Sequence, residues 1–232
     1  MISVKNITKQ YGKGHNIFTA LDDVSFEVLD HSSVAIIGKS GSGKSTLMHI
    51  MSGLDRPTTG TITINNKNLL KMTDREMDHF RATSVGFVFQ SFFIEANQTV
   101  FQNVMLPLEI AKVPPRKRAA IIKTALKAVE LTDKASTSAG KLSGGQKQRL
   151  AVARAIVNKP EILFADEPTG NLDSATGNKV MELLFDLNKR LGCTLILVTH
   201  DVDLANRCEM QVTIKDGKIE SVRTPSPSKA AK

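Results

Sequence analysis

The stretch Ser33-Val34-Ala35-Ile36-Ile37-Gly38-Lys39-Ser40-Gly41-Ser42-Gly43-Lys44-Ser45-Thr46 decides the fold. A short apolar run leads into a glycine-rich loop, and a helical pattern follows, as the GxxxxGK[ST] motif requires. The glycines bring backbone N–H groups to phosphate oxygens, Lys44 adds a charge for the β and γ phosphates, and the Ser45 hydroxyl completes a Mg²⁺ shell. A glycine turn without a ligand is disfavoured because Lys-Ser-Thr follows at the right offset. The stretch predicts a nucleotide triphosphate site.

A second phosphate-contact motif, Leu142-Ser143-Gly144-Gly145-Gln146, precedes a helical run from Gln146 to Val157. A helix N-terminus favours a phosphate through its unpaired N–H groups and its dipole. One ATP needs only one such site. We therefore expect a head-to-tail pair of chains, in which each ATP lies between the first motif of one chain and the second motif of the other.

Working outward, buried-strand patterns recur at 162–165 and 194–199 with a long helical pattern between them, which favours a parallel α/β sheet. Residues 2–7 and 18–29 alternate as an N-terminal antiparallel β layer, and 210–215 with 218–222 read as a closing hairpin. The pattern from about 91 to 159 is helical and predicts an inserted subdomain. We expect one domain over 1–223 and a disordered tail over 224–232.

The composition is that of an ordinary globular chain: 232 residues, 41% of them hydrophobic. The apolar runs are far shorter than the roughly 18 residues that span a bilayer, and no secretory signal is visible, so we expect a cytosolic location. The net charge of +8 fits a solvated surface, a membrane headgroup contact or nucleic acid. No interleaved aromatic residues accompany the local basic cluster at Lys112 and 116–118, so nucleic acid is the weakest of the three. Cys193 and Cys208 are expected to be small buried residues.

Three strand ends carry polar side chains, and in parallel sheets such ends face the ligand crevice. Asp166 and Glu167 end one apolar strand: Asp166 suits a water-mediated Mg²⁺ contact, and Glu167 can orient or deprotonate the attacking water. His200 follows a second strand, where an imidazole can hydrogen-bond the γ phosphate. Gln90 ends a third, where its amide can contact Mg²⁺ or water. Structural roles as strand-end polar groups remain the alternatives for these residues.

With these motifs in view, the chain resembles the ATPase subunit of an ATP-binding cassette (ABC) transporter over its whole length apart from a short tail. The stretches at 87–92, 103–108 and 167–173 make it most similar to the lipoprotein-releasing and macrolide-exporting branch. The resemblance implies that Gln90 links hydrolysis to the helical insert, that His200 is the switch histidine, and that Tyr11 stacks on adenine, the alternative being a surface tyrosine. It also implies that the loop of Asp173 crosses the dimer seam, where Asp173 further suits a helix N-cap.

The resemblance implies an ATPase with the cofactors ATP and Mg²⁺, an ATP-dependent homodimer, and a membrane permease subunit on a separate chain at the inner face of the cell membrane. DNA-repair and translation ABC proteins and unrelated P-loop kinases fit less well. The short extent after the hairpin favours export or mechanical transmission, with division-linked signalling as the alternative. An apolar segment after Gln90 is expected to offer the membrane subunit a groove. Its residues are Phe92, Phe93, Ile94, Val100, Phe101 and Val104.

Overall fold

The computed structural model describes residues 1–224. It divides into two compact units: the first comprises Met1–Met77 together with the chain from Ile196 onward, and the second comprises Asp78–Leu195. The predicted tail falls almost wholly outside the described residues. The expected helical subdomain, about 91–159, lies within the second unit, and its boundaries remain a prediction.

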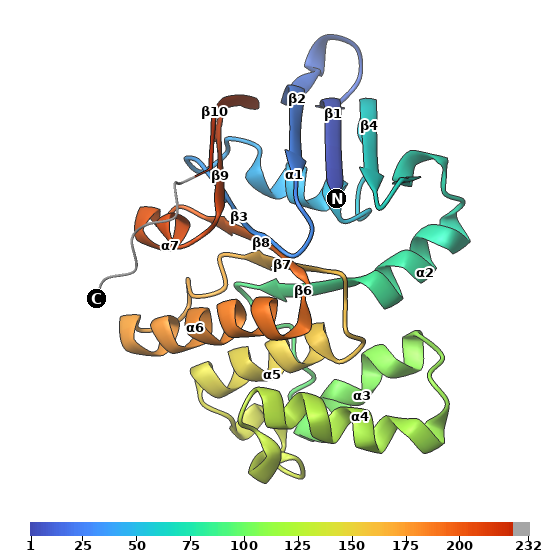
Figure 1. The fold of residues 1–232 in the computed structure, drawn as a ribbon, viewed down its shortest axis with the longest axis vertical. Helices are drawn as coiled ribbons and strands as arrows, with labels where there is room; N and C mark the ends of the chain where they lie inside the picture. The colour runs from blue at the N-terminus through green and yellow to red at the C-terminus, as the bar shows by residue number, and fades with distance from the viewer. Residues whose placement is uncertain (225–232) are drawn as a thin grey trace. The chain divides into compact units, whose positions relative to one another are not determined.

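The first unit is built mainly from strands (Figure 1). An antiparallel sheet has the order β2-β1-β4-β5, and a second sheet places β9 between β10 and β3. The elements of this unit are β1 Ile2–Tyr11, the 3₁₀ turn η1 Gly14–Asn16, β2 Phe18–Val28, β3 Ser33–Ile37, α1 Lys44–Met51, β4 Thr59–Ile64, β5 Lys67–Asn68, η2 Leu69–Lys71, α7 Val202–Asn206, β9 Met210–Lys215 and β10 Lys218–Arg223.

The pattern of side chains explains these strands. In β1 the buried residues Ile2, Val4 and Ile7 face the core, and β3 is buried over nearly its whole length, as a central strand should be. The predicted hairpin is confirmed: β9 and β10 pair antiparallel across Asp216 and Gly217, both with positive φ, as a tight two-residue turn requires. β8, Thr194–Thr199, is fully buried and carries the chain from the second unit into the first.

The second unit is mainly helical (Figure 1). α5 packs against β6, α3, α4 and α6, so it lies at the centre of this unit. The core face of α4 is formed by Ile122, Ala125 and Leu126, which are buried. The elements here are α2 Asp74–Ser84, which begins in the first unit, β6 Val85–Phe89, α3 Val100–Ile110, α4 Pro115–Ala128, the 3₁₀ turns η3 Thr132–Lys134 and η4 Ala139–Lys141, α5 Gly144–Ile156, β7 Ile162–Asp166 and α6 Ser174–Leu191.

β6 and β7 pair in parallel, and their register sets the geometry of the site. Val85 lies opposite Ile162, and Phe89 lies opposite Asp166. Stacked aromatic rings hold the pair together, with the ring centroids of Phe87 and Phe164 5.6 Å apart. Since the last residues of both strands are paired, Gln90 and Glu167 leave the sheet at the same edge.

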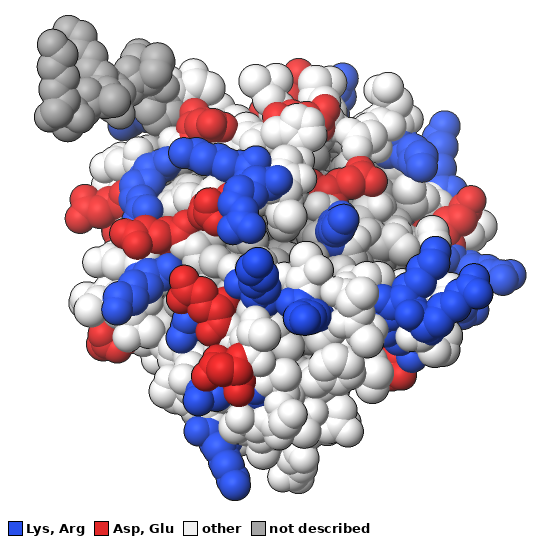
Figure 2. Space-filling model, turned by 60° about the horizontal axis from the view of Figure 1, so that its bottom comes forward, with Lys and Arg blue, Asp and Glu red and all other residues white. Residues whose placement is uncertain are grey.

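On the face drawn in Figure 2, basic and acidic side chains are interspersed among uncharged ones. Within residues 1–224, no helix is both long and apolar enough to cross a bilayer. Both cysteines are buried as predicted, and burial raises the pKa of the Cys193 thiol to about 11 and of the Cys208 thiol to about 12.

Candidate functional site

The glycine loop in the first unit is shaped by close backbone contacts. A Cβ on Gly38 would lie 2.2 Å from the Ile214 carbonyl oxygen, and one on Gly43 would lie 2.6 Å from the Ala20 carbonyl oxygen. Gly43 is also the N-cap of α1, with a φ of 106° that favours glycine. A glycine cap offers no side-chain acceptor, so the N–H groups of the first turn of α1 suit an external anion.

Lys44 lies inside this loop. It is only 9% exposed, and its Nζ donates to the carbonyl oxygens of Gly38 at 2.9 Å and Lys39 at 2.8 Å. These two bonds leave a third ammonium proton for a ligand oxygen. The buried Oγ of Ser42 has no hydrogen-bond partner among residues 1–224, as expected of a group built to meet a ligand. The donor set and the orphaned hydroxyl fit a bound phosphate.

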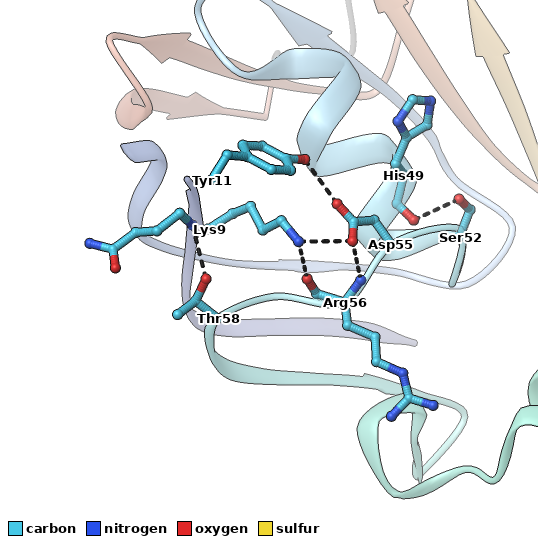
Figure 3. Close-up of polar contacts among 8 residues, drawn as sticks. Lys9, Tyr11, His49, Ser52, Asp55, Arg56 and Thr58 are labelled. Atoms are coloured by element: carbon cyan, nitrogen blue, oxygen red, sulfur yellow. Dashed lines mark hydrogen bonds and ion pairs between the residues drawn. The ribbon is translucent and has the colours of Figure 1, made fainter. Parts of the chain in front are cut away.

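Tyr11 is held by a small polar cluster, shown in Figure 3. Its hydroxyl donates to Asp55 Oδ2 at 2.8 Å, and Lys9 Nζ lies 4.7 Å from the ring centroid. Lys9 also donates to Asp55 Oδ1 at 2.8 Å. The ring is 42% exposed, so it can meet a ligand. The cluster fixes the orientation of the aromatic side chain that the sequence assigns to adenine.

The protonation of this cluster follows from its contacts. Burial raises the pKa of the Tyr11 hydroxyl, and the Asp55 carboxylate adds to the rise, whereas a hydrogen bond with the Thr46 side chain opposes it. Burial alone would raise the pKa of Asp55, but hydrogen bonds from Lys9, Tyr11 and the Arg56 N–H together hold it below its usual value.

The carboxylate pair in the second unit follows β7. Asp166 and Glu167 are both half-buried, and the backbone of Glu167 is left-handed with a φ of 46°. That conformation is unfavourable for a residue with a side chain, by roughly 1–3 kcal/mol, and persists only where neighbours impose it. Here the Gly170 N–H donates to the Glu167 carbonyl at 3.0 Å and closes a turn.

Gln90 contacts the segment after Glu167. Asn171 Nδ2 donates to the Gln90 carbonyl at 2.9 Å, and Gln90 Nε2 lies 3.5 Å from Asn171 Oδ1. A Cβ on Gly170 would lie 2.6 Å from Gln90 Nε2, so that glycine makes room for the amide. The structure thus brings Gln90 together with the loop of the carboxylates, a contact made through Asn171 that the sequence reasoning did not assign.

The second motif forms the N-terminus of α5 through a capping box. Ser143 Oγ accepts from the Gln146 N–H at 3.4 Å, and Gln146 Oε1 accepts from the Ser143 N–H at 3.0 Å. Behind it, a Cβ on Gly145 would lie 2.4 Å from Thr176 Cγ2, so α5 approaches α6 closely. Ser143, Gly145 and Gln146 line a groove of about 750 Å³ between the ends of α4 and α5 and the side of α6. Gly144 is exposed.

Two further predicted residues occupy defined positions. Asp173 caps α6 as predicted, accepting from the Thr176 N–H at 3.0 Å. Hydrogen bonding with the Thr176 side chain, and then with the Thr176 N–H, lowers the pKa of the Asp173 carboxyl. His200 is exposed and follows β8 in the first unit. The neighbouring Asp201 N-caps α7 by accepting from Asp203 and Leu204, which holds the start of this segment in place.

The candidate Mg²⁺ ligands divide between the units, with Ser45 in the first and Gln90 and Asp166 in the second. Residues 1–224 contain no cluster of three or more His, Cys, Asp or Glu that could hold a metal ion by itself. Mg²⁺ usually takes few protein ligands and completes its octahedron with phosphate oxygens and water. A hydroxyl, an amide and a carboxylate fit that chemistry.

The apolar segment after Gln90 is only partly exposed. Phe93 is 68% exposed, whereas Val100 and Val104, both part of α3, are fully buried. Phe92, Ile94 and Phe101 are half-buried. The expected groove would therefore depend on the aromatic residues, and two of its six predicted members belong to the core.

Sequence comparison shows relatives along almost the whole chain. Residues 21–170 match the family model described as ABC transporter. The lipoprotein-releasing system ATP-binding protein LolD of Syntrophus aciditrophicus is 40% identical over 94% of this chain and 98% of that protein. An uncharacterised ABC transporter ATP-binding protein of Thermotoga maritima is 42% identical over 96% and 94% of the two chains.

Solved structures of ABC transporter cassettes are also similar to this chain. The dimeric structure of MJ0796, a bacterial ABC transporter cassette, is 41% identical, with a TM-score of 0.87 over 97% of this chain and 98% of that one. A dimeric post-hydrolysis state of the same cassette, bound to ADP and Pi, gives the same TM-score at 40% identity. MJ0796 is a protein of Methanocaldococcus jannaschii. These similarities confirm the predicted P-loop α/β fold.

Proposed function

The chain belongs to the ABC transporter family of ATP-binding proteins, an ATPase family, and from that premise we propose that it is the ATP-driven motor of an exporter or of a mechanical transmission system. The observation that carries the proposal is that both predicted phosphate motifs of the chain lie at helix N-termini, those of α1 and α5. A head-to-tail dimer uses both. The relative MJ0796 is dimeric, which supports this arrangement.

On this proposal the residues from Gly38 to Thr46 hold the triphosphate, with Lys44 facing the β and γ phosphates. Ser45, Gln90 and Asp166 would hold Mg²⁺, and the bound ion would neutralise charge on the phosphates. Glu167 orients the attacking water and accepts its proton, and His200 keeps water and base in register. Tyr11 stacks on the adenine. The partner chain presents Ser143, Gly144, Gly145, Gln146 and Asp173 to the same nucleotide.

The partners follow from the same arrangement. A second copy of the chain completes each site, and a membrane subunit on a separate chain receives the motion at the inner face of the cell membrane. The LolD relatives act in a lipoprotein-releasing system, which favours export. A division-linked signalling ATPase, acting through a membrane partner without cargo, is the second candidate, because such an ATPase resembles the same branch of the family. Nucleic acid has no part in either proposal.

The test is complementation between two defective chains. Lys44→Ala removes the charge inside the glycine loop and should weaken ATP binding, whereas Ser143→Arg should leave binding intact and block closure on the partner's nucleotide. A mixed dimer retains one intact composite site, so the mixture should recover ATP-dependent association and part of the turnover that each variant lacks alone. A mixture that stays monomeric with ATP and Mg²⁺, where wild type dimerises, would contradict the head-to-tail arrangement.

A further inference from the structure

Gln148 is a buried amide in the middle of the helix that begins at the second phosphate motif. It is 0% exposed, although its neighbours Lys147 and Arg149 are charged and partly exposed. Its Nε2 donates to two backbone carbonyl oxygens, that of Pro168 at 2.6 Å and that of Phe89 at 3.2 Å. The side chain therefore joins α5 to the ends of both β6 and β7.

The hydrogen bonds of this amide can be accounted for completely. Two carbonyl acceptors require the NH₂ group, which settles the orientation of the amide and uses both of its protons. The Oε1 atom is buried and has no hydrogen-bond partner among residues 1–224. An unpaired buried acceptor is destabilising, and a methionine of similar length would avoid that penalty. The two donated bonds are thus what this side chain contributes.

Those bonds hold the segments that carry the predicted chemistry. Phe89 immediately precedes Gln90, and Pro168 immediately follows Glu167. Phe89 also lies opposite Asp166 in the sheet register, and Asn171 binds the Gln90 carbonyl at 2.9 Å. One amide consequently holds both segments that follow β6 and β7. The helix that carries this amide, α5, begins at the second phosphate motif, which is assigned to the nucleotide of the other composite site.

We infer that Gln148 is a positioning residue that sets Gln90 and Glu167 relative to α5, and so links the two composite sites through a single chain. Contact of the α5 N-terminus with one nucleotide shifts the helix, and the amide passes that shift to the hydrolytic residues that serve the other. The inference rests on the proposed function, because two composite sites exist only in the head-to-tail dimer. To the head-to-tail dimer it adds a coupling between the two composite sites through Gln148.

The experiment compares Gln148→Met with Gln211→Met in the full-length chain. Gln211 is a matched control, since it is 8% exposed and its Nε2 donates to the Ala205 carbonyl at 3.1 Å and to Asn206 Oδ1 at 3.0 Å, within the first unit. We expect Gln148→Met to lower kcat by about tenfold or more with KM for ATP within about twofold of wild type, because the glycine loop is untouched. Gln211→Met should keep both constants within about twofold.

A second variant guards against a packing artefact. Gln148→Glu keeps the shape of the side chain and, when ionised, loses its two N–H donors. It should also lower kcat and leave KM for ATP close to that of wild type. Either folded variant with a kcat within about twofold of that of Gln211→Met would overturn the inference. Loss of folding in both Gln148 variants, with Gln211→Met still folded, would also overturn it by showing a purely structural role.

Two further variants, Glu167→Gln and Gln148→Met/Glu167→Gln, distinguish failure of this inference from failure of the proposed function. Wild type without ATP turnover, or Glu167→Gln with undiminished turnover, would contradict the proposed function itself. The double variant Gln148→Met/Glu167→Gln should form the ATP-dependent dimer at the same ATP concentration as Glu167→Gln alone, because positioning for hydrolysis is not needed for closure. A clear shift of that midpoint would show that Gln148 acts on dimer formation, against the inference.

Discussion

The N-termini of α1 and α5 are both assigned to phosphate, yet they are built in opposite ways. At α1 the cap is Gly43, in a left-handed conformation and with no side-chain hydrogen bond to the helix. At α5 the cap is Ser143, and it exchanges hydrogen bonds with Gln146. The first helix end has no side-chain cap, whereas the second satisfies part of its own donors.

The difference matches two tasks. A helix end with unpaired N–H groups is stabilised by an anion and suits a site that holds the nucleotide in a single chain. A capped helix end is stable without a ligand, so in the proposed head-to-tail dimer it can be released and re-engaged as the two chains separate and associate. We therefore expect changes at α1 to impair nucleotide binding, and changes at α5 to impair association of the two chains.

The largest effect should come from Lys44→Ala. Loss of the charged hydrogen bonds, each contributing roughly 1.5–3 kcal/mol, should weaken ATP binding by on the order of 10–100-fold in the monomer. Calorimetry with ATP measures this, with Lys67→Ala as the control at an exposed lysine of the same unit. Unchanged affinity would show that α1 does not hold the phosphates, and the comparison would fail.

Gly145→Ala should have the next largest effect. Its Cβ would meet Thr176 Cγ2 at 2.4 Å, whereas a Cβ on the neighbouring Gly144 would lie 3.5 Å from Leu172, an ordinary contact. Overpacking of this kind destabilises by roughly 1–3 kcal/mol, so thermal unfolding should shift for Gly145→Ala and not for Gly144→Ala. Thr176→Ser removes the clashing methyl group and should restore the double variant. Failure of that rescue would place the strain elsewhere.

Ser143→Ala should have a smaller effect, confined to the cap. Loss of an N-cap oxygen destabilises by about 1 kcal/mol, or roughly 2–4 °C for a chain of this size. Thr99→Ala removes the same capping box from α3 and should give a similar shift in thermal denaturation. Since Ser143 is not part of the glycine loop, ATP affinity of the monomer should stay unchanged. A matching loss of affinity would erase the distinction between the two helix ends.

The smallest effect concerns pH. The pKa of Asp173 is lowered by its bonds to Thr176, so its contribution to stability is present above the unfolded value, near 4, and is lost as pH falls through the folded value. The difference in melting temperature between wild type and Asp173→Ala should therefore shrink as the solution is acidified below about pH 4. The difference in melting temperature between wild type and Ser143→Ala should not shrink, because the Ser143 cap is neutral. Parallel pH profiles for both variants would contradict the assignment.

Much of this arrangement could be predicted, because local patterns determine it. The limits of β8 and β9 agree with the predicted ranges 194–199 and 210–215, because the apolar pattern of each strand is clear in the sequence. The N-cap role of Asp173 could also be predicted from the sequence, because a cap acts within one turn of its helix. The short helix α7, Val202–Asn206, was missed, as five residues carry too little periodicity.

The residues that were missed depend on contacts distant in sequence. Gln148 lies between Lys147 and Arg149, so its local pattern is that of an exposed helix face, whereas its two hydrogen bonds are to Phe89 and Pro168, which are distant in sequence. Asn171 was read as part of a loop at the dimer seam, and its bond to Gln90 arises from the strand register. Burial of Val100 and Val104 follows from how α3 packs on α5. These contacts and this burial depend on tertiary packing, which the local sequence pattern does not contain.

Tyr11 makes the protein a spectroscopic reporter of its own site. The chain has one tyrosine and no tryptophan, so its tyrosine absorbance and emission come from one ring, the one held by Asp55 and Lys9. Addition of ATP should change that emission if adenine stacks there, without any label or added chromophore. The same signal followed in alkali reads the ionisation of that hydroxyl, expected above its ordinary value near 10.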